Sequence, residues 1–243
     1  MTCASDPCIE LHNVTVVRGH RVVLNHVNLR ARCGEFIVII GANGAGKTTL
    51  LQVVNGTVQP ASGQVSVLGK SPSFLNGYKL RRNVGFVAQA PHFDPRLPVT
   101  VLETVVSGCF GKRGLFRRIR PEDWQKARQA LAWVGISHLA DRPLGSISGG
   151  EFQRSAIARV LVQEPALLLF DEPTNSLDVR AKSEIVKLIE RIHGETRATT
   201  LYVTHDLKYL PDRCDRILFI QKGEICGDGR PEELLPKIVV QEL

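Results

Sequence analysis

Residues 41–48, Gly-Ala-Asn-Gly-Ala-Gly-Lys-Thr, have the composition of a phosphate-binding loop and directly follow the apolar run 36–40. Glycines let a backbone adopt positive φ and approach a ligand closely, so that N–H groups and the next helix N-terminus bind an anion. Lys47 offers a positive charge to β- and γ-phosphates, and the Thr48 hydroxyl is a ligand for Mg²⁺. A chance glycine-rich turn is the alternative, which the filled pattern disfavours. The predicted nucleotide-binding residues here are Gly41, Ala42, Asn43, Gly44, Ala45, Gly46, Lys47, Thr48 and Thr49.

Two adjacent carboxylates, Asp171 and Glu172, come directly after the apolar run 167–170. This run predicts a buried strand, and ligands of open α/β sheets bind at the carboxyl ends of the strands. One carboxylate can hold Mg²⁺ through its waters while the other orients and polarises the water that attacks a γ-phosphate. We assign the first role to Asp171 and the second to Glu172. A solvated or helix-capping acidic pair is the alternative.

A second candidate anion site is the segment Ser148-Gly149-Gly150-Glu151, which precedes an amphipathic stretch. Ser-x-x-Glu is also a capping box that begins a helix, and both roles can hold at once. Because a helix N-terminus of this kind binds anions, the chain has two phosphate sites for one nucleotide. Two chains that share nucleotides across an interface would account for both.

The elements that must position these residues alternate as in an α/β fold. Alternating or continuous apolar residues predict strands at 9–17, 22–29, 64–68, 84–87, 167–170, 200–203 and 217–220. Helical patterns occupy 101–106, 121–134, 150–163 and 182–193, the first three as an inserted block. Residues 90–98 contain three prolines and predict an extended connector into that block. The later apolar runs indicate a buried, largely parallel sheet.

Composition sets broad limits on the kind of protein. A chain of 243 residues with 43% hydrophobic content fits one domain, and it contains no apolar stretch long enough to span a membrane. Six cysteines without a Cys-x-x-Cys pair indicate reduced thiols of a cytosolic protein rather than a metal site or disulfide framework. The net charge of +7 is compatible with nucleic acid, an anionic membrane or a nucleotide. The basic stretch 112–120 is expected to be a solvated loop, because only 6% of the chain is aromatic, and no direct nucleic-acid partner is expected.

With these motifs in this order, the chain resembles the ATP-binding subunits of ABC transporters over essentially all of its length. By that resemblance, residues 41–48 are Walker A, Gln89 is the Q-loop glutamine and residues 147–151 are the signature. Walker B is then 167–172, the D-loop lies at 175–178 with Ser176 and Asp178, and the switch histidine is His205. The resemblance implies a RecA-like core sheet, an N-terminal antiparallel β subdomain and an inserted helical subdomain. It divides the single domain 1–243 into a core, 1–90 and 164–243, and a helical part of about 91–163.

The resemblance also implies site roles. ATP and Mg²⁺ are the expected substrate and cofactor, with Glu172, His205 and Gln89 in catalysis and with Thr48, Gln89 and Asp171 at the metal. The signature residues Ser148, Gly149, Gly150 and Glu151 would bind the ATP held by a partner subunit.

Two motifs depart from the family pattern, at three positions in all. Ile147 and Glu151 replace the usual Leu and Gln of the signature, and Glu151 adds negative charge near a phosphate site. Arg18 precedes Gly19 where the family usually has an aromatic residue that stacks on adenine. A guanidinium plane can also stack on a base, so Arg18 is a candidate nucleotide-binding residue, with a solvated turn residue as the alternative.

The implied function is ATP hydrolysis by a homodimer, or by paired ATPase subunits, that drives a separate multi-span membrane permease. The subunit would be peripheral at the cytoplasmic face of the membrane, with an extracytoplasmic substrate-binding protein as an indirect partner. Residues 93–101 and 108–118 look like those of zinc and manganese importers, whereas 174–178 have the generic form, so chelated iron or another solute stays open. A non-transport ABC protein acting on nucleic acid is the rival from another class, and a kinase or GTPase is disfavoured because Asn-Lys-x-Asp is absent.

Overall fold

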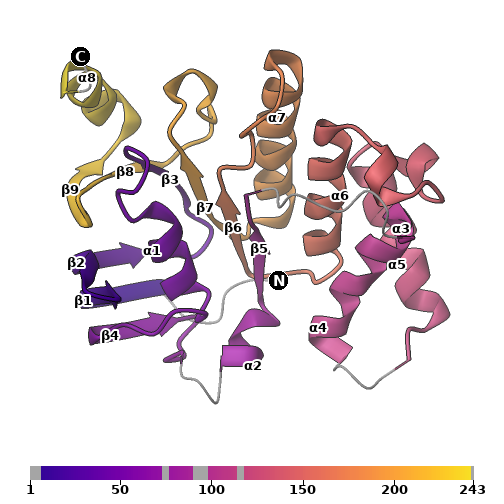
Figure 1. Cartoon of the computed structure of the whole chain (residues 1–243), viewed down its shortest axis with the longest axis horizontal. Coiled ribbons are helices and arrows are strands. Elements are labelled where there is room, and N and C mark those ends of the chain that lie inside the picture. The colour runs from indigo at the N-terminus through magenta and orange to yellow at the C-terminus, as the bar shows by residue number, and fades with distance from the viewer. Residues whose placement is uncertain (1–6, 73–76, 90–97, 114–117, 242–243) are drawn as a thin grey trace.

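The computed structural model describes residues 7–72, 77–89, 98–113 and 118–241. Its N-terminal third forms an antiparallel sheet of β1 (Ile9–Arg18), β2 (Arg21–Ala31) and β4 (Ser62–Val67), in the order β2-β1-β4. This sheet occupies the lower left of Figure 1. The predicted strands at 9–17, 22–29 and 64–68 are therefore confirmed, each within two residues at either end.

The central sheet has six strands in the order β5-β6-β7-β3-β8-β9. These are β5 (Val84–Val87), β6 (Leu167–Asp171), β7 (Thr199–Thr204), β3 (Phe36–Ile40), β8 (Arg216–Gln221) and β9 (Glu224–Gly229). Pairing is parallel from β5 to β8, and β9 adds one antiparallel edge strand. Every residue of β3, β6 and β7 is buried, which explains their unbroken apolar runs.

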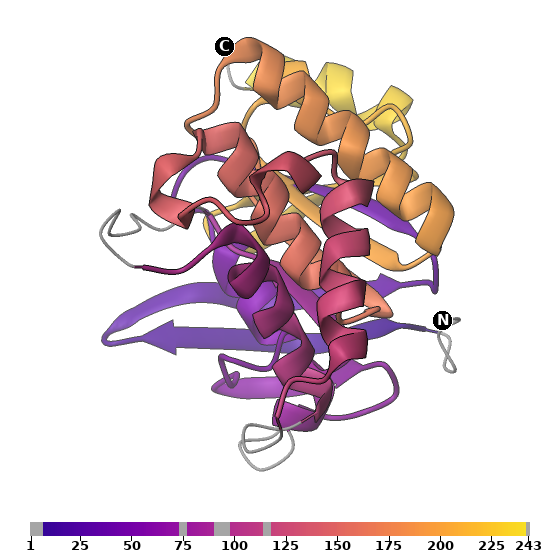
Figure 2. The same ribbon diagram turned by 90° about the vertical axis from the view of Figure 1, so that its right-hand side faces the viewer.

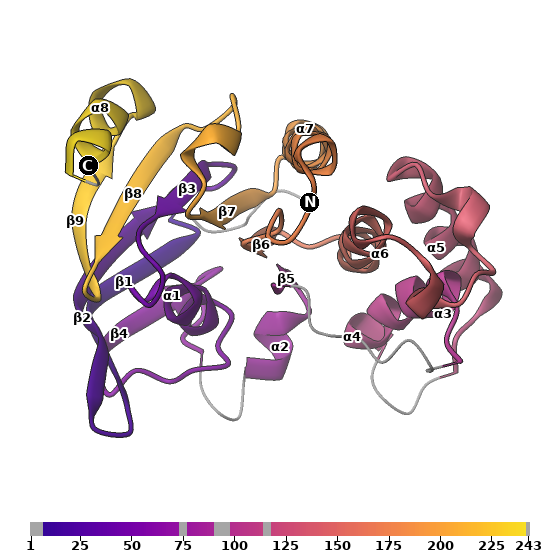
Figure 3. The same cartoon turned by 45° about the horizontal axis from the view of Figure 1, so that its top comes forward.

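Alternate side chains of β3 enter two different hydrophobic clusters. Ile37 and Ile39 pack with helix α1 (Lys47–Val54) and the antiparallel sheet, so α1 lies between the two sheets, as Figure 3 shows. Phe36 and Val38 face the opposite side, where α7 (Val179–Thr196) covers the central sheet. Because successive side chains of a strand face opposite sides of the sheet, β3 takes part in both clusters and joins the two layers.

A block of helices lies beside the β5 edge of the central sheet and faces the viewer in Figure 2. It contains α3 (Val101–Val106), α4 (Phe110–Arg113), α5 (Pro121–Trp133) and α6 (Gly149–Leu161), with 3₁₀ turns at Ser107–Cys109, Ser137–Leu139 and Leu144–Ser146. Its apolar side chains belong to the same buried cluster as α7. The division into a core and a helical subdomain stays a prediction, and the expected connector 90–98 lies outside the described residues except for its last position.

Several elements differ from expectation. The remaining helices are α2 (Gly77–Arg81), α8 (Pro231–Gln241) and a 3₁₀ turn at Leu207–Tyr209, and neither α8 nor β9 was predicted. Helix α7 exceeds the predicted 182–193 by three residues at each end, because Asp178 caps its first turn and Arg197, in a left-handed conformation, ends it. Within the described ranges, no helix combines the length and apolarity that a membrane span requires.

Candidate nucleotide-binding site

The phosphate-binding loop, residues 41–48, connects the end of β3 to the start of α1. Gly46 has φ of +108°, and a Cβ added there would lie 2.8 Å from a Leu24 methyl carbon and 2.9 Å from the Val23 carbonyl oxygen. A Cβ on Gly41 would lie 2.1 Å from the Ile220 carbonyl oxygen. The loop therefore passes too close to β2 and β8 to carry side chains at these two positions.

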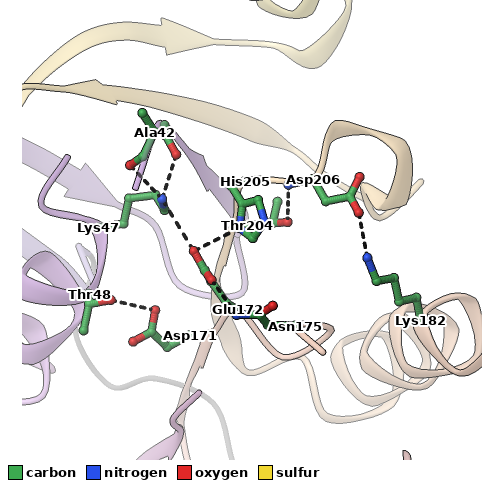
Figure 4. Close-up of polar contacts among 11 residues, drawn as sticks. Ala42, Lys47, Thr48, Asp171, Glu172, Asn175, Lys182, Thr204, His205 and Asp206 are labelled. Atoms are coloured by element: carbon green, nitrogen blue, oxygen red, sulfur yellow. Dashed lines mark hydrogen bonds and ion pairs between the residues drawn. The ribbon is translucent and has the colours of Figure 1, made fainter. Parts of the chain in front are cut away.

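The Lys47 side chain is buried, and its ammonium bends back over the loop that precedes it (Figure 4). Its Nζ donates hydrogen bonds to the carbonyl oxygens of Gly41, at 2.7 Å, and Ala42, at 3.0 Å. The same Nζ lies 3.6 Å from Oε1 of Glu172. A positive charge is thus fixed at the loop, where phosphates would lie.

Thr48 and Asp171 meet across the interface of α1 and β6. The Thr48 hydroxyl donates to Oδ1 of Asp171 at 3.1 Å. Burial, above all, raises the pKa of the Asp171 carboxyl, although the Thr48 hydrogen bond opposes that rise. One hydroxyl and one carboxylate suit Mg²⁺, which is typically held by one or two carboxylates together with phosphates and water. The described residues contain no cluster of three metal-binding side chains that would form an all-protein cage.

Glu172 lies at the centre of the site. Its Oε1 is 3.1 Å from Nδ1 of His205, while Asn175 donates a hydrogen bond of 3.3 Å to its Oε2. His205 follows β7 and Glu172 follows β6, and these strands are neighbours in the sheet, so their carboxyl ends bring the two side chains together. The Glu172 side chain is only 13% exposed.

A pocket of about 300 Å³ opens over these groups. It is lined by Val23, Asn43, Gly44, Gly46, Lys47, Thr48, Thr49, Gln89, Glu172 and Asn175. The structure thus brings Gln89, which follows β5, to the same pocket as the phosphate-binding loop. Sequence reasoning missed two lining residues: Asn175 begins the D-loop match and could have been included, whereas Val23 carries no local signal.

Arg18 lies at the β1–β2 hairpin and does not line this pocket. Its guanidinium donates a hydrogen bond to the side-chain oxygen of Gln52, on α1. The structure therefore places Arg18 against the helix that follows the phosphate-binding loop. Its predicted role at the base stays a prediction.

A second pocket, of about 540 Å³, shares no residue with the first. We call it the signature pocket; it is lined by Ser148, Gly149, Gly150, Glu151, Arg154, Ser176, Leu177, Asp178, Arg180, Ala181, Glu184 and Ile185. Predicted signature and D-loop residues therefore meet on one chain. Asn175 faces the first pocket and Ser176 the second, so the D-loop lies between the two.

The capping box predicted at the start of α6 is present. The Ser148 hydroxyl and its backbone N–H both donate to Oε2 of Glu151 at 2.8 Å, and the Glu151 N–H donates to the Ser148 hydroxyl at 3.4 Å. The backbone hydrogen bond is the main reason that the pKa of Glu151 is lowered. The charged carboxylate of Glu151 therefore occupies donors that the sequence assigns to phosphate.

Known proteins match this chain over most of its length. The ABC transporter family model matches residues 24–175. The zinc import ATP-binding protein ZnuC of Pseudomonas fluorescens is 37% identical over 95% of this chain and 79% of its own length. The petrobactin import ATP-binding protein YclP of Bacillus subtilis is 32% identical over 97% of this chain and 92% of its own. The sulfate/thiosulfate import ATP-binding protein CysA of Pectobacterium atrosepticum is 35% identical, and the chain covers 67% of it.

Solved structures agree with these sequence matches. CbiO1 from Clostridium perfringens, part of the ABC transporter complex CbiONQ, has a TM-score of 0.83 with 32% identity, covering 98% of this chain and 94% of its own. The ATP-binding cassette MJ0796, a dimer bound to ADP and Pi, has a TM-score of 0.80 with 30% identity, covering 91% and 98%. The predicted α/β fold of an ABC-type ATPase is thereby confirmed. The chain belongs to the ABC transporter family, as one of its ATP-binding subunits.

Proposed function

We propose that this chain binds and hydrolyses ATP as the engine of an ABC importer. The observation that carries the proposal is the position of the Glu172 carboxylate, held between the Lys47 ammonium and the His205 ring beside the phosphate-binding loop. Three charged or titratable groups from separate segments converge where a γ-phosphate and its attacking water would meet. Phosphoryl transfer depends mainly on such positioning and on electrostatic stabilisation.

Each group has a task in this mechanism. Lys47 binds the β- and γ-phosphates, which compete with Glu172 for its ammonium and so release the carboxylate toward water. Glu172 then orients and polarises that water, and His205 holds the carboxylate and donates toward the γ-phosphate. Thr48, Gln89 and Asp171 would hold Mg²⁺, which neutralises phosphate charge when bound.

A partner subunit completes the proposed active unit. The separation of the signature pocket from the nucleotide pocket supports the proposal that Ser148, Gly149, Gly150 and Glu151 bind ATP held by a second copy or a paired ATPase. The dimeric state of MJ0796 supports this assembly. We further propose a multi-span permease as partner, fed by an extracytoplasmic substrate-binding protein, with this subunit peripheral at the cytoplasmic face. No direct nucleic-acid partner is proposed.

For the cargo we propose a metal ion, zinc or manganese. Support comes from the zinc importer relative and from a probable metal transport ATP-binding protein of Thermotoga maritima, which is 33% identical. The sulfate and petrobactin importers have similar identities, so a chelated iron or another solute is the alternative. The permease partner decides between them, because the proposed site would bind nucleotide rather than cargo.

The substitution Glu172→Gln tests the catalytic proposal. It keeps the size and hydrogen-bonding capacity of the side chain while removing its negative charge. We expect phosphate release to fall by about 100-fold or more, because general base catalysis contributes on that scale. ATP binding should persist, measured by equilibrium dialysis with labelled ATP. Near-normal turnover in this variant would remove Glu172 from the catalytic role.

Purification of the tagged protein from detergent-solubilised host membranes tests the transport proposal. Mass spectrometry should find a multi-span membrane protein at near-equal abundance. Zinc and manganese uptake by cells that lack this chain then tests the cargo, with sulfate and iron-chelate uptake as comparisons. Co-purification of ribosomes or DNA in place of a permease would overturn the transport role.

A further inference from the structure

We propose that Lys182 is a positioning residue for His205, and that it links the start of α7 to the loop that carries the switch histidine. The inference rests on the proposed ATPase function and extends it to a residue outside the nucleotide pocket. Lys182 belongs to the first turns of α7, just after the D-loop, and does not line either pocket.

The contact itself is an ion pair between two partly buried side chains. The Lys182 ammonium lies 3.0 Å from Oδ2 of Asp206, and each side chain is 24% exposed. The same ammonium is 5.1 Å from the centroid of the Tyr209 ring, a distance that suits a cation–π contact. Two partners from one loop therefore fix the position of one lysine, as Figure 4 shows for Asp206.

Asp206 in turn fixes the backbone around His205. Its N–H donates to the Thr204 hydroxyl at 3.0 Å, and its Oδ1 accepts from the Lys208 N–H at 3.2 Å. Asp206, the residue that Lys182 holds, is thus hydrogen-bonded across His205 to Thr204 and also to the next turn of the loop at Lys208. Since Nδ1 of His205 is 3.1 Å from Glu172, displacement of this turn would displace the partner of the proposed base.

The same end of α7 begins at the signature pocket. Asp178 caps the helix by accepting a hydrogen bond of 2.9 Å from the Ala181 N–H, and Ser176 and Asp178 line that pocket. Lys182 stands one turn beyond Asp178. A partner subunit that shifts the D-loop would therefore shift the first turn of α7 and, through Lys182 and Asp206, the switch loop.

The effect should appear in catalysis rather than in stability. A partly exposed ion pair contributes little to the free energy of unfolding. Small displacements of a catalytic group, in contrast, lower the rate strongly. We expect Lys182→Met to lower kcat about tenfold with an unchanged KM for ATP and little change in the melting temperature. Lys182→Arg should restore most of the turnover, because it keeps the positive charge within reach of Asp206.

Two further variants make the test specific. Lys187→Met removes the same type of residue from an exposed position of the same helix and should hydrolyse ATP as the wild type does. Asp206→Asn should lower kcat as Lys182→Met does, and the double variant should be no slower than either single one. Wild-type kcat in Lys182→Met, or multiplicative losses in the double variant, would overturn the inference. If Glu172→Gln instead hydrolysed ATP as fast as the wild type does, the proposed function itself would be overturned.

Discussion

Glu172 combines backbone strain with a position at the centre of the candidate site. Its φ is +48°, a left-handed conformation that costs a residue with a side chain about 1–3 kcal/mol. Its N–H donates to the Val203 carbonyl at 3.1 Å, so the turn remains bonded to β7 as the strand ends. The turn leaves the carboxylate beside Lys47 and His205. Such strain is found where the surrounding structure fixes a functional side chain.

Glu151 leads to a prediction at the residue scale. Its carboxylate accepts hydrogen bonds from both donors of Ser148, so the phosphates of a partner's ATP, bound there as proposed, would compete with a negative charge. Glu151→Gln removes that charge and can keep the capping box. On a Glu172→Gln background, we expect ATP-driven dimerisation to strengthen by roughly fivefold, or about 1 kcal/mol, at low salt. Analytical ultracentrifugation at two salt concentrations measures it. If the Glu151→Gln variant and its parent had equal dimer affinities at both salt concentrations, the proposed repulsion would be contradicted.

Arg18 leads to a second residue-scale prediction. No aromatic side chain lines the nucleotide pocket as described, and the Arg18 guanidinium is bonded to Gln52. Arg18→Tyr would provide a flat ring for adenine, and base stacking is worth about 1 kcal/mol or more. We expect KM for ATP to fall about fivefold. Competition between ATP and GTP in the same hydrolysis assay is the measurement, and Arg18→Ala is the control. An unchanged KM in Arg18→Tyr would place the adenine elsewhere.

At the scale of elements, local sequence patterns predicted the buried strands but not the elements at the β8 edge of the sheet. Continuous apolar runs predicted β3, β6 and β7 because both faces of these strands are buried. Strand β9 escaped prediction because Glu224–Gly229 alternates exposed and half-buried positions and contains two glycines. Helix α8 contains Pro236, a residue that usually ends a helix. Both elements owe their existence to packing at the β8 edge.

In the candidate nucleotide-binding site, too, local motifs predicted some features, whereas others depend on how distant segments pack. Motifs at strand ends predicted which residues gather, since parallel strands end together. The pairing of Lys47 with Glu172 joins residues 125 positions apart in the sequence and depends on strand order, which no local pattern encodes. Val23 enters the pocket from the antiparallel sheet for the same reason.

The capping box of α3 gives a pH prediction at this scale. Oε2 of Glu103 accepts hydrogen bonds from the backbone N–H and hydroxyl of Thr100, and these lower its pKa. A carboxyl whose folded pKa is below its unfolded value stabilises the protein above the unfolded pKa, near 4.5, and loses this contribution as pH falls through the folded value. Glu103→Gln should flatten the acid side of the stability profile, measured by urea unfolding between pH 3 and 6. Parallel profiles for wild type and variant would contradict this account.

For the whole molecule, the decisive feature is that two candidate phosphate pockets share one chain without sharing a residue. The D-loop separates them, with Asn175 facing one and Ser176 the other. Helix α1 follows the first site and α6 the second, and these helices belong to different hydrophobic clusters. A movement between the two clusters would therefore change the distance between sites. In one chain alone, both pockets would be open to solvent. In a dimer of two chains in opposite orientation, the signature pocket of each chain would close the nucleotide pocket of the other.

That arrangement predicts complementation between two inactive variants. Lys47→Ala removes the phosphate-binding ammonium but leaves the signature pocket intact. Ser148→Asp keeps a good N-cap for α6 while placing a second negative charge against the phosphates. Each variant alone should hydrolyse ATP poorly, because every composite site in its dimer lacks one half. In a mixed dimer, one site combines the intact loop of one chain with the intact signature of the other. Mixing should therefore restore part of the wild-type turnover, measured as phosphate release across mixing ratios with a maximum near equal amounts. Activity that only averages the two variants would mean that each chain acts alone and that the signature pocket serves another purpose.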